Sequence, residues 1–142
     1  MFDLASNIIP KKSITALDRT ATVTGSIVDL KDYKAASVMV CIGAVAIADA
    51  SNYFTFTIEV GDDSGLSDAA EVSSYEVSKL AAGTTWDRKV NATGEADDVA
   101  LVGFNAGGKR YARVKATETG TAQATFGAYF VLGEALTKPA VA

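Results

Sequence analysis

The sequence predicts an all-β domain, built as an antiparallel β-sandwich or a squashed barrel. Residues 53–60 alternate strictly between apolar side chains and threonine or glutamate, which is the pattern of a half-buried strand. Other short runs rich in valine, isoleucine and threonine follow, with glycine-containing turns and no long helix between them. An antiparallel sheet made of such runs has to be covered by a second sheet.

The strands expected before this one are less regular. Residues 20–30 are rich in threonine and valine, and Gly25 marks an expected bulge. Residues 37–45 are continuously apolar, which predicts a strand covered on both faces. A buried helix is the alternative, and the valine, isoleucine and Gly43 content disfavours it.

Three further segments are expected to complete the sheets. Residues 99–104 and 110–117 flank a turn with Gly107 and Gly108, which predicts a hairpin connection. A second turn then leads into a strand over residues 122–132.

Residues 67–80 are ambiguous. Asp68 and Glu71 have the spacing of a helix capping box, whereas Ala70 and Val72 are spaced like inward residues of a strand. We expect a strand or an irregular segment here.

The ends of the chain differ from its body. Residues 1–19 carry isolated apolar side chains with no clear period, which predicts an extended N-terminal arm. Residues 20–133 form the predicted sandwich or barrel domain, and residues 134–142, with Pro139, form a short C-terminal tail. We expect such arms to become ordered by lying on another surface.

Composition excludes several classes of protein. With 142 residues, 49% of them hydrophobic, the chain is a single folded domain and not a disordered segment. A net charge of −4 disfavours nucleic acid and anionic membranes as partners. The apolar run 35–48 is too short for a bilayer-spanning helix, and residues 1–10 do not resemble a signal peptide, so we expect synthesis in a cytoplasm.

The chain also lacks the usual residues of an active site. It contains no histidine, the commonest general base and metal ligand, and Cys41 permits no internal disulfide. Cys41 lies in an apolar run, where a cysteine is usually an inert small hydrophobe. We therefore expect no enzyme, no cofactor and no metal.

Two motifs have a simpler interpretation than a binding site. Gly103 to Lys109 has the glycine and lysine spacing of a phosphate-binding loop, but Arg110 replaces the metal-binding hydroxyl and a strand pattern follows. Asp62, Ser64 and Asp68 lack the bidentate glutamate of a calcium loop, so we expect a solvated turn.

A basic stripe is expected on the strand over residues 110–117. Tyr111, Arg113 and Lys115 share one face of that strand. One aromatic and two cations could bind a nucleic-acid backbone, but the acidic balance of the chain favours a solvated face or a protein contact.

Six short segments follow one another in a characteristic order. They are 28–33 (Val-Asp-Leu-Lys-Asp-Tyr) with the apolar strand after it, 61–64 (Gly-Asp-Asp-Ser), 102–104 (Val-Gly-Phe), 109–114 (Lys-Arg-Tyr-Ala-Arg-Val), 119–121 (Thr-Gly-Thr) and 131–133 (Val-Leu-Gly) before a proline-containing end. In these segments most of the chain, residues 29–139, resembles the capsid decoration (cement) proteins of tailed bacteriophages.

This resemblance implies a structural role in the virion. Copies would sit on the outer surface of the capsid, as homotrimers bound to the major capsid protein, and would reinforce the shell. The low content of charged residues, 21%, agrees with a surface partly buried by neighbours. The alternatives are a tail or neck protein and a β-sandwich module that binds carbohydrate or a cell surface, for which Trp86 and Tyr75 are the candidate aromatic residues.

On the decoration hypothesis the arm anchors the protein to a partner chain, the basic stripe adds a protein contact, and Trp86 is a weaker candidate anchor. The predicted interface residues are Phe2, Leu4, Ile8, Ile9, Trp86, Tyr111, Arg113 and Lys115.

Overall fold

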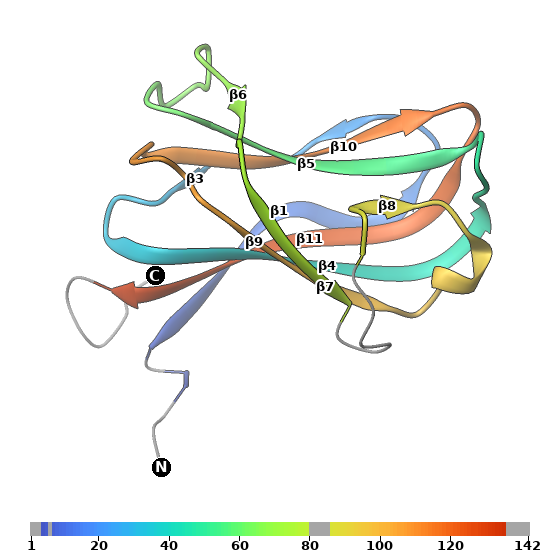
Figure 1. Ribbon diagram of the computed structural model, residues 1–142, viewed down its shortest axis with the longest axis horizontal. Helices are drawn as coiled ribbons and strands as arrows, with labels where there is room; N and C mark the ends of the chain where they lie inside the picture. Colours follow the sequence, from blue (N-terminus) through green and yellow to red (C-terminus); the bar gives the residue numbers. More distant parts are fainter. Residues whose placement is uncertain (1–3, 6, 80–85, 136–142) are drawn as a thin grey trace.

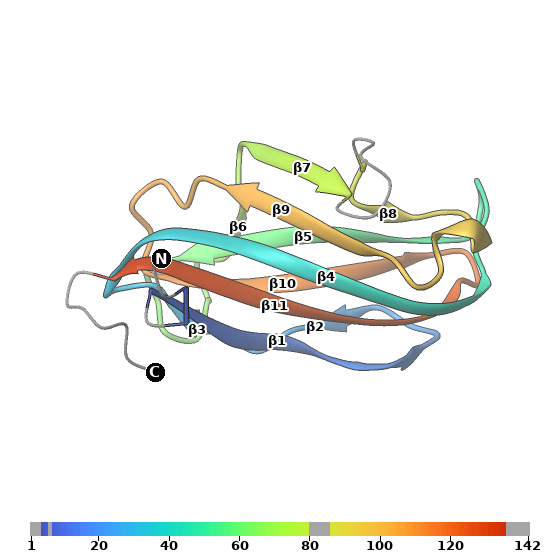
Figure 2. The same cartoon turned by 90° about the horizontal axis from the view of Figure 1, so that it is seen from below.

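The computed structural model describes residues 4–5, 7–79 and 86–135, which form two antiparallel sheets packed face to face (Figures 1 and 2). Sheet A has the strand order β1-β11-β4-β9-β7, and its strands are β1 (Ile8–Arg19), β4 (Tyr33–Ile47), β7 (Tyr75–Lys79), β9 (Val99–Phe104) and β11 (Gln123–Ala135). Sheet B has the order β2-β10-β5-β6, with β3 also paired to β10 and β8 to β5. Its strands are β2 (Val23–Thr24), β3 (Val28–Asp29), β5 (Tyr53–Gly61), β6 (Ala70–Glu71), β8 (Lys89–Val90) and β10 (Tyr111–Thr119). The predicted all-β sandwich is confirmed.

The core lies between the two sheets and is centred on three phenylalanines. The strict alternation in β5 turns Phe54, Phe56, Ile58 and Val60 inward, as predicted. Phe126 of β11 lies against two of them from the other sheet, with its ring centre 4.9 Å from those of Phe54 and Phe56. Edge-to-face ring contacts of this kind stabilise the packing of one sheet on the other.

The expected hairpin between β9 and β10 is wrong. β9 pairs with β4 and β7 in sheet A, whereas β10 pairs with β5 in sheet B, so the turn between them crosses from one sheet to the other. Gly107 and Gly108 do supply the positive φ angles of a turn, at 60° and 80°. Turn residues predict that the chain reverses, but they do not predict whether the two strands pair with each other.

The expected boundary of the N-terminal arm is also wrong, because residues 8–19 form β1. This strand pairs with β11 from Ile8 opposite Gly133 to Arg19 opposite Ala124, and Ile9 and Ile14 are buried. Register shifts on either side of Ile14 interrupt the alternation, which is why the sequence shows no clear period there. The C-terminal strand β11 likewise continues to Ala135, past the predicted start of the tail.

The ambiguous stretch is not helical over its described part, residues 67–79. It contains β6 and β7 with an irregular link between them, in agreement with the prediction. Val72 in this link and Tyr75 at the start of β7 close the edge of β5. The Ile58 N–H donates a hydrogen bond to the Tyr75 hydroxyl (3.0 Å), and the Val72 N–H donates to the Ile58 carbonyl (3.0 Å). Covering an edge in this way prevents further strand pairing there.

Arg88 closes the next part of the same edge. Its backbone carbonyl accepts the Phe56 N–H (2.8 Å), and its guanidinium donates to the Phe56 carbonyl (3.1 Å). The guanidinium also lies over the Tyr75 ring, 3.9 Å from its centre. Burial raises the pKa of Tyr75 to about 12, so its hydroxyl stays protonated and can donate to Glu71 (3.1 Å).

Candidate protein-binding surfaces

The outer face of sheet A carries a grid of nine residues without a charge. The grid lies on the three middle strands, and cross-strand pairing sets its rows. In the central row Tyr129 lies opposite Met39, and Met39 lies opposite Leu101. The full rows are Val131, Ser37 and Gly103; Tyr129, Met39 and Leu101; and Gly127, Cys41 and Val99. We call this grid the apolar face.

Charged side chains border the apolar face on opposite sides. Lys12 on β1 lies opposite Tyr129, and Glu76 on β7 lies opposite Gly103. Both side chains are exposed. Asp18, opposite Thr125, also lies on the β1 border, so charged residues of both signs flank an uncharged centre.

The apolar face explains why residues 37–45 read as a strand covered on both sides. Val38, Val40 and Ile42 are buried in the core, as expected, but Met39 and Cys41 on the other side are only half-buried. β4 lies in the middle of sheet A, and sheet B covers one of its faces only. The composition of β4 fits burial on both sides, whereas this chain covers one side only.

Cys41 lies in the apolar face. The apolar run around it had predicted a strand covered on both faces, but Cys41 is only half-buried. Burial raises the pKa of its thiol, which keeps the thiol protonated and poorly reactive. Cys41 thus contributes to the surface as a small apolar side chain.

The outer face of sheet B has the opposite character. Tyr111, Arg113 and Lys115 share this face, as predicted, but the charges find partners within the sheet. Arg113 Nε lies 2.6 Å from a carboxylate oxygen of Glu59, directly opposite on β5, and Lys115 Nζ lies 3.9 Å from the other oxygen. This face is a paired and solvated surface, and less suited to burial than the apolar face.

The other predicted anchors are distributed between core and surface. Trp86 is 3% exposed, packs on Phe56 and donates from its indole nitrogen to the Lys89 carbonyl, so it is a core residue. Ile9 is buried within its own chain, and Ile8 is half-buried beside it. Leu4 is 66% exposed and remains available to a partner, while Phe2 lies outside the described residues.

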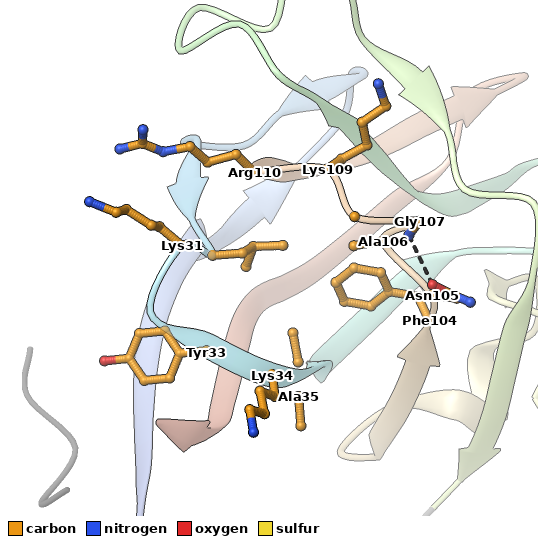
Figure 3. A pocket seen from close by; sticks show the side chains of 13 residues that line it. Lys31, Tyr33, Lys34, Ala35, Phe104, Asn105, Ala106, Gly107, Lys109 and Arg110 are labelled. Carbon is orange, nitrogen blue, oxygen red and sulfur yellow. Dashed lines mark hydrogen bonds between the residues drawn. The ribbon is translucent and has the colours of Figure 1, made fainter. Parts of the chain in front are cut away.

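A hollow of about 620 Å³ lies at one end of the sandwich, between the start of β4 and the turn before β10 (Figure 3). Leu30 and Phe104 line it, and the side chains of Lys31 and Lys34 point away from it. Lys109 and Arg110 at its rim form ion pairs, at 2.6 Å with Asp62 and at 2.8 Å with Asp29.

The hollow does not have the geometry of a phosphate cradle. The Gly107 N–H donates to its own chain, to the side-chain oxygen of Asn105 at 2.8 Å. The chain then enters β10, so no helix N-terminus faces the hollow. The glycine and lysine spacing noted in the sequence belongs to a turn.

The acidic loop after β5 uses its carboxylates to hold the turn. Asp68 accepts the N–H groups of Asp62 (2.8 Å) and Asp63 (3.2 Å), and these hydrogen bonds lower its pKa. Asp63 accepts from Ser67 Oγ and from the Gly65 N–H. Among the described residues no cluster of three or more acidic, cysteine or histidine side chains could hold a metal ion.

Within the described ranges there is no helix with the length and apolar content that crossing a membrane requires. No protein-family model matches the chain, and no curated protein matches it significantly. Among solved structures, the crystal structure of SPBc2 prophage-derived protein YomS is similar over 87% of this chain and 94% of that chain, with 11% sequence identity and a TM-score of 0.46. A likeness of this size indicates neither family nor function, so the function has to be inferred from the surfaces of the chain itself.

Proposed function

We propose that this chain is a structural protein of a tailed-bacteriophage virion, and that it decorates the outer surface of the capsid by binding the major capsid protein. The observation that carries the proposal is the apolar face. It is formed by strands that are paired on both sides, and it is uncharged over nine residues. Such a surface gains free energy when another protein covers it, because apolar area is then removed from water.

The sequence resemblance selects the kind of assembly. Capsid decoration proteins act by covering a repeating shell, which calls for a rigid module with broad contact surfaces. The tightly packed core around Phe54, Phe56 and Phe126 provides that rigidity. The exposed Leu4 before β1 offers an additional contact outside the sheets.

A carbohydrate-binding module is less well supported. Such a module needs an exposed aromatic platform on which a sugar ring can stack. Trp86 is buried, and the ring of Tyr75 is covered by Arg88 while its hydroxyl is engaged by Glu71 and Ile58. Neither candidate aromatic residue therefore offers a free face.

The test is co-sedimentation with capsids of the phage whose genome carries this sequence, stripped of their own decoration protein. Wild-type protein is expected to bind saturably, with a number of copies that follows the shell symmetry. Met39→Glu places a carboxylate in the apolar face and is expected to weaken binding at least about tenfold. Thr55→Glu, on the outer face of sheet B, is the matched control and should bind like wild type.

Two outcomes contradict the proposal. Wild-type protein that stays in the supernatant at every concentration would exclude a role on the shell. Rings or tubes formed without shells, seen by electron microscopy, would favour a tail or neck protein instead.

A further inference from the structure

We infer that the hollow at the end of the sandwich binds an extended, acidic peptide segment of a partner protein, which pairs with an open edge of β4. The inference goes beyond the proposed function, which concerns the apolar face, and assigns a separate contact site. Three features of the hollow carry it: an uncovered strand edge, an apolar floor and a cationic rim (Figure 3).

The first residues of β4 are paired on one side only. Pairing with β11 continues to Tyr33 opposite Ala135, whereas pairing with β9 ends at Ser37 opposite Gly103. The chain then leaves sheet A through the turn that borders the hollow and enters β10 in sheet B. Residues 33–36 therefore line the hollow with an edge that no strand covers in the part of the chain that the structure describes.

The backbone of Lys34 faces this gap. The Ile42 N–H donates to the Asp98 carbonyl (2.9 Å), directly before β9, and the pairing of β4 with β11 is regular from Tyr33 to Ile42. Backbone groups alternate in direction along a strand, so those of Lys34 lie on the same side as those of Ile42. Because the ladder to β9 ends at Ser37, the Lys34 N–H and carbonyl are open to an added strand.

The floor of the hollow is apolar. Leu30 is 7% exposed, and the ring of Phe104 packs on that of Phe130, with ring centres 5.9 Å apart. The volume of about 620 Å³ lies in the usual range of ligand sites. Residues 33–36 extend over roughly 13 Å, which suits a peptide of about four residues that turns one apolar side chain onto this floor.

The rim is cationic. Among the described residues that line the hollow, four are cations and none is an acid. Two of the cations, Lys109 and Arg110, are held in the ion pairs with Asp62 and Asp29. The other two, Lys31 and Lys34, are exposed and form no ion pair within the described ranges. Their side chains point into solvent, so they are free to turn toward a carboxylate at the mouth.

The acidic residues nearest to the rim do not line the hollow. Asp32 lines a neighbouring depression that shares Tyr33, and Glu76 lines another that shares Phe104. Glu134 lies on β11, which pairs with the opposite edge of β4. The mouth thus carries excess positive charge on a chain of net charge −4, and this selects an acidic occupant over a basic one.

The test is an NMR titration of the full-length protein with the capped peptide acetyl-Ala-Asp-Val-Glu-Ala-amide. Millimolar peptide is expected to shift the amide signals of residues 30–36 and 104–110 saturably. The Lys34 amide should exchange with solvent at least about tenfold more slowly in the complex, because it gains a hydrogen-bond acceptor. The control ligands are acetyl-Ala-Lys-Val-Lys-Ala-amide and inorganic phosphate, and neither should protect this amide.

Substitutions at Lys34 separate the strand edge from the charge. Lys34→Pro removes the open N–H without touching the pairs with β11, and Lys34→Ala removes only the charge. The proline variant should weaken peptide binding at least about tenfold and the alanine variant about threefold. Lys31→Glu should also weaken it about threefold, whereas Lys11→Glu, the same change outside the hollow, should have no effect. Circular dichroism checks that each variant is folded.

The inference is overturned if the acidic peptide gives no saturable shifts, if the basic peptide or phosphate protects the Lys34 amide equally well, or if the proline and alanine variants bind alike. The two proposals fail separately. A protein that ignores shells but protects Lys34 in the peptide complex loses the decoration role and keeps the peptide site. A protein that binds shells through Met39 but takes up no peptide keeps only the decoration role.

Discussion

The hydroxyl of Ser13 on β1 joins the two sheets. It accepts a hydrogen bond from the Val114 N–H on β10 at 3.1 Å and donates one to the Ser26 carbonyl at 3.0 Å. β2 and β3 both pair with β10 but leave a gap between them, and Ser13 satisfies the Val114 amide within that gap. A buried polar residue that uses both its donor and its acceptor in this way fixes the position of β1 over sheet B.

Ser13→Ala is expected to lower the free energy of unfolding by about 1–3 kcal/mol, because the Val114 amide is left buried without an acceptor. Urea denaturation followed by fluorescence measures the change. Thr15→Ala, at an exposed position of the same strand, is the control and should change stability by less than about 0.5 kcal/mol. Equal stability of Ser13→Ala and wild type would contradict the role of this hydroxyl.

Truncation of the N-terminus separates the strand from the segment before it. Deleting residues 1–12 removes the buried Ile9 and the first pairs between β1 and β11, so we expect a clear loss of thermal stability. Deleting residues 1–6 leaves β1 whole and should leave the melting temperature nearly unchanged. Shell binding by the shorter deletion then reports on the segment with Leu4 alone, and normal binding would exclude it as an anchor.

Arg113→Glu is expected to destabilise the fold by about 1 kcal/mol, because it places a second carboxylate directly opposite Glu59. The double variant Glu59→Arg, Arg113→Glu restores opposite charges and should recover most of the loss in a urea titration. The stable double variant also tests the predicted protein contact. If the basic stripe binds the shell, co-sedimentation of this variant should weaken; unchanged binding would exclude that role.

Trp86 provides a fluorescence signal for the core. It is the single tryptophan of the chain and is 3% exposed, so its emission should be blue-shifted and poorly quenched by acrylamide until the protein unfolds. Binding to shells should not change the spectrum. Trp86→Ala should cost about 3–5 kcal/mol. Strong quenching in the folded protein would show instead that Trp86 is a surface anchor.

The pKa of Tyr75 predicts a loss of stability at alkaline pH. Burial raises this pKa from its ordinary value of 10.0 to about 12 in the folded chain. Between these values the unfolded chain loses the proton and the folded chain retains it, so the unfolded state is favoured as the pH rises from 10 to 12. Below pH 10 both states are protonated and the contribution is constant.

Tyr75→Phe is the matching variant. At pH 8 it should cost about 1 kcal/mol, because the Ile58 N–H loses its acceptor. Between pH 8 and pH 11 its unfolding free energy should fall less than that of the wild type. Parallel curves for the two proteins would show that Tyr75 does not titrate as described.

The strands could be predicted from the sequence where the alternation of apolar and polar residues is regular. Much of the candidate binding surface could not be predicted. β5 was identifiable with its inward residues because Phe54, Phe56 and Ile58 follow one another at period two. β1 escaped prediction because its register shifts break that period around Ile14. The basic stripe was placed on the correct strand, but its pairing with Glu59 depends on a residue 54 positions away in the chain.

The amino-acid pattern alone specifies which stretches become strands, where the chain turns, and that residues 37–45 suit burial on two sides, because these are properties of neighbouring residues. Folding specifies which strands share a sheet, as the separation of β9 from β10 shows. It also leaves Met39, Leu101 and Tyr129 on an outer face, because the chain contains one covering sheet and a sheet has two sides to cover.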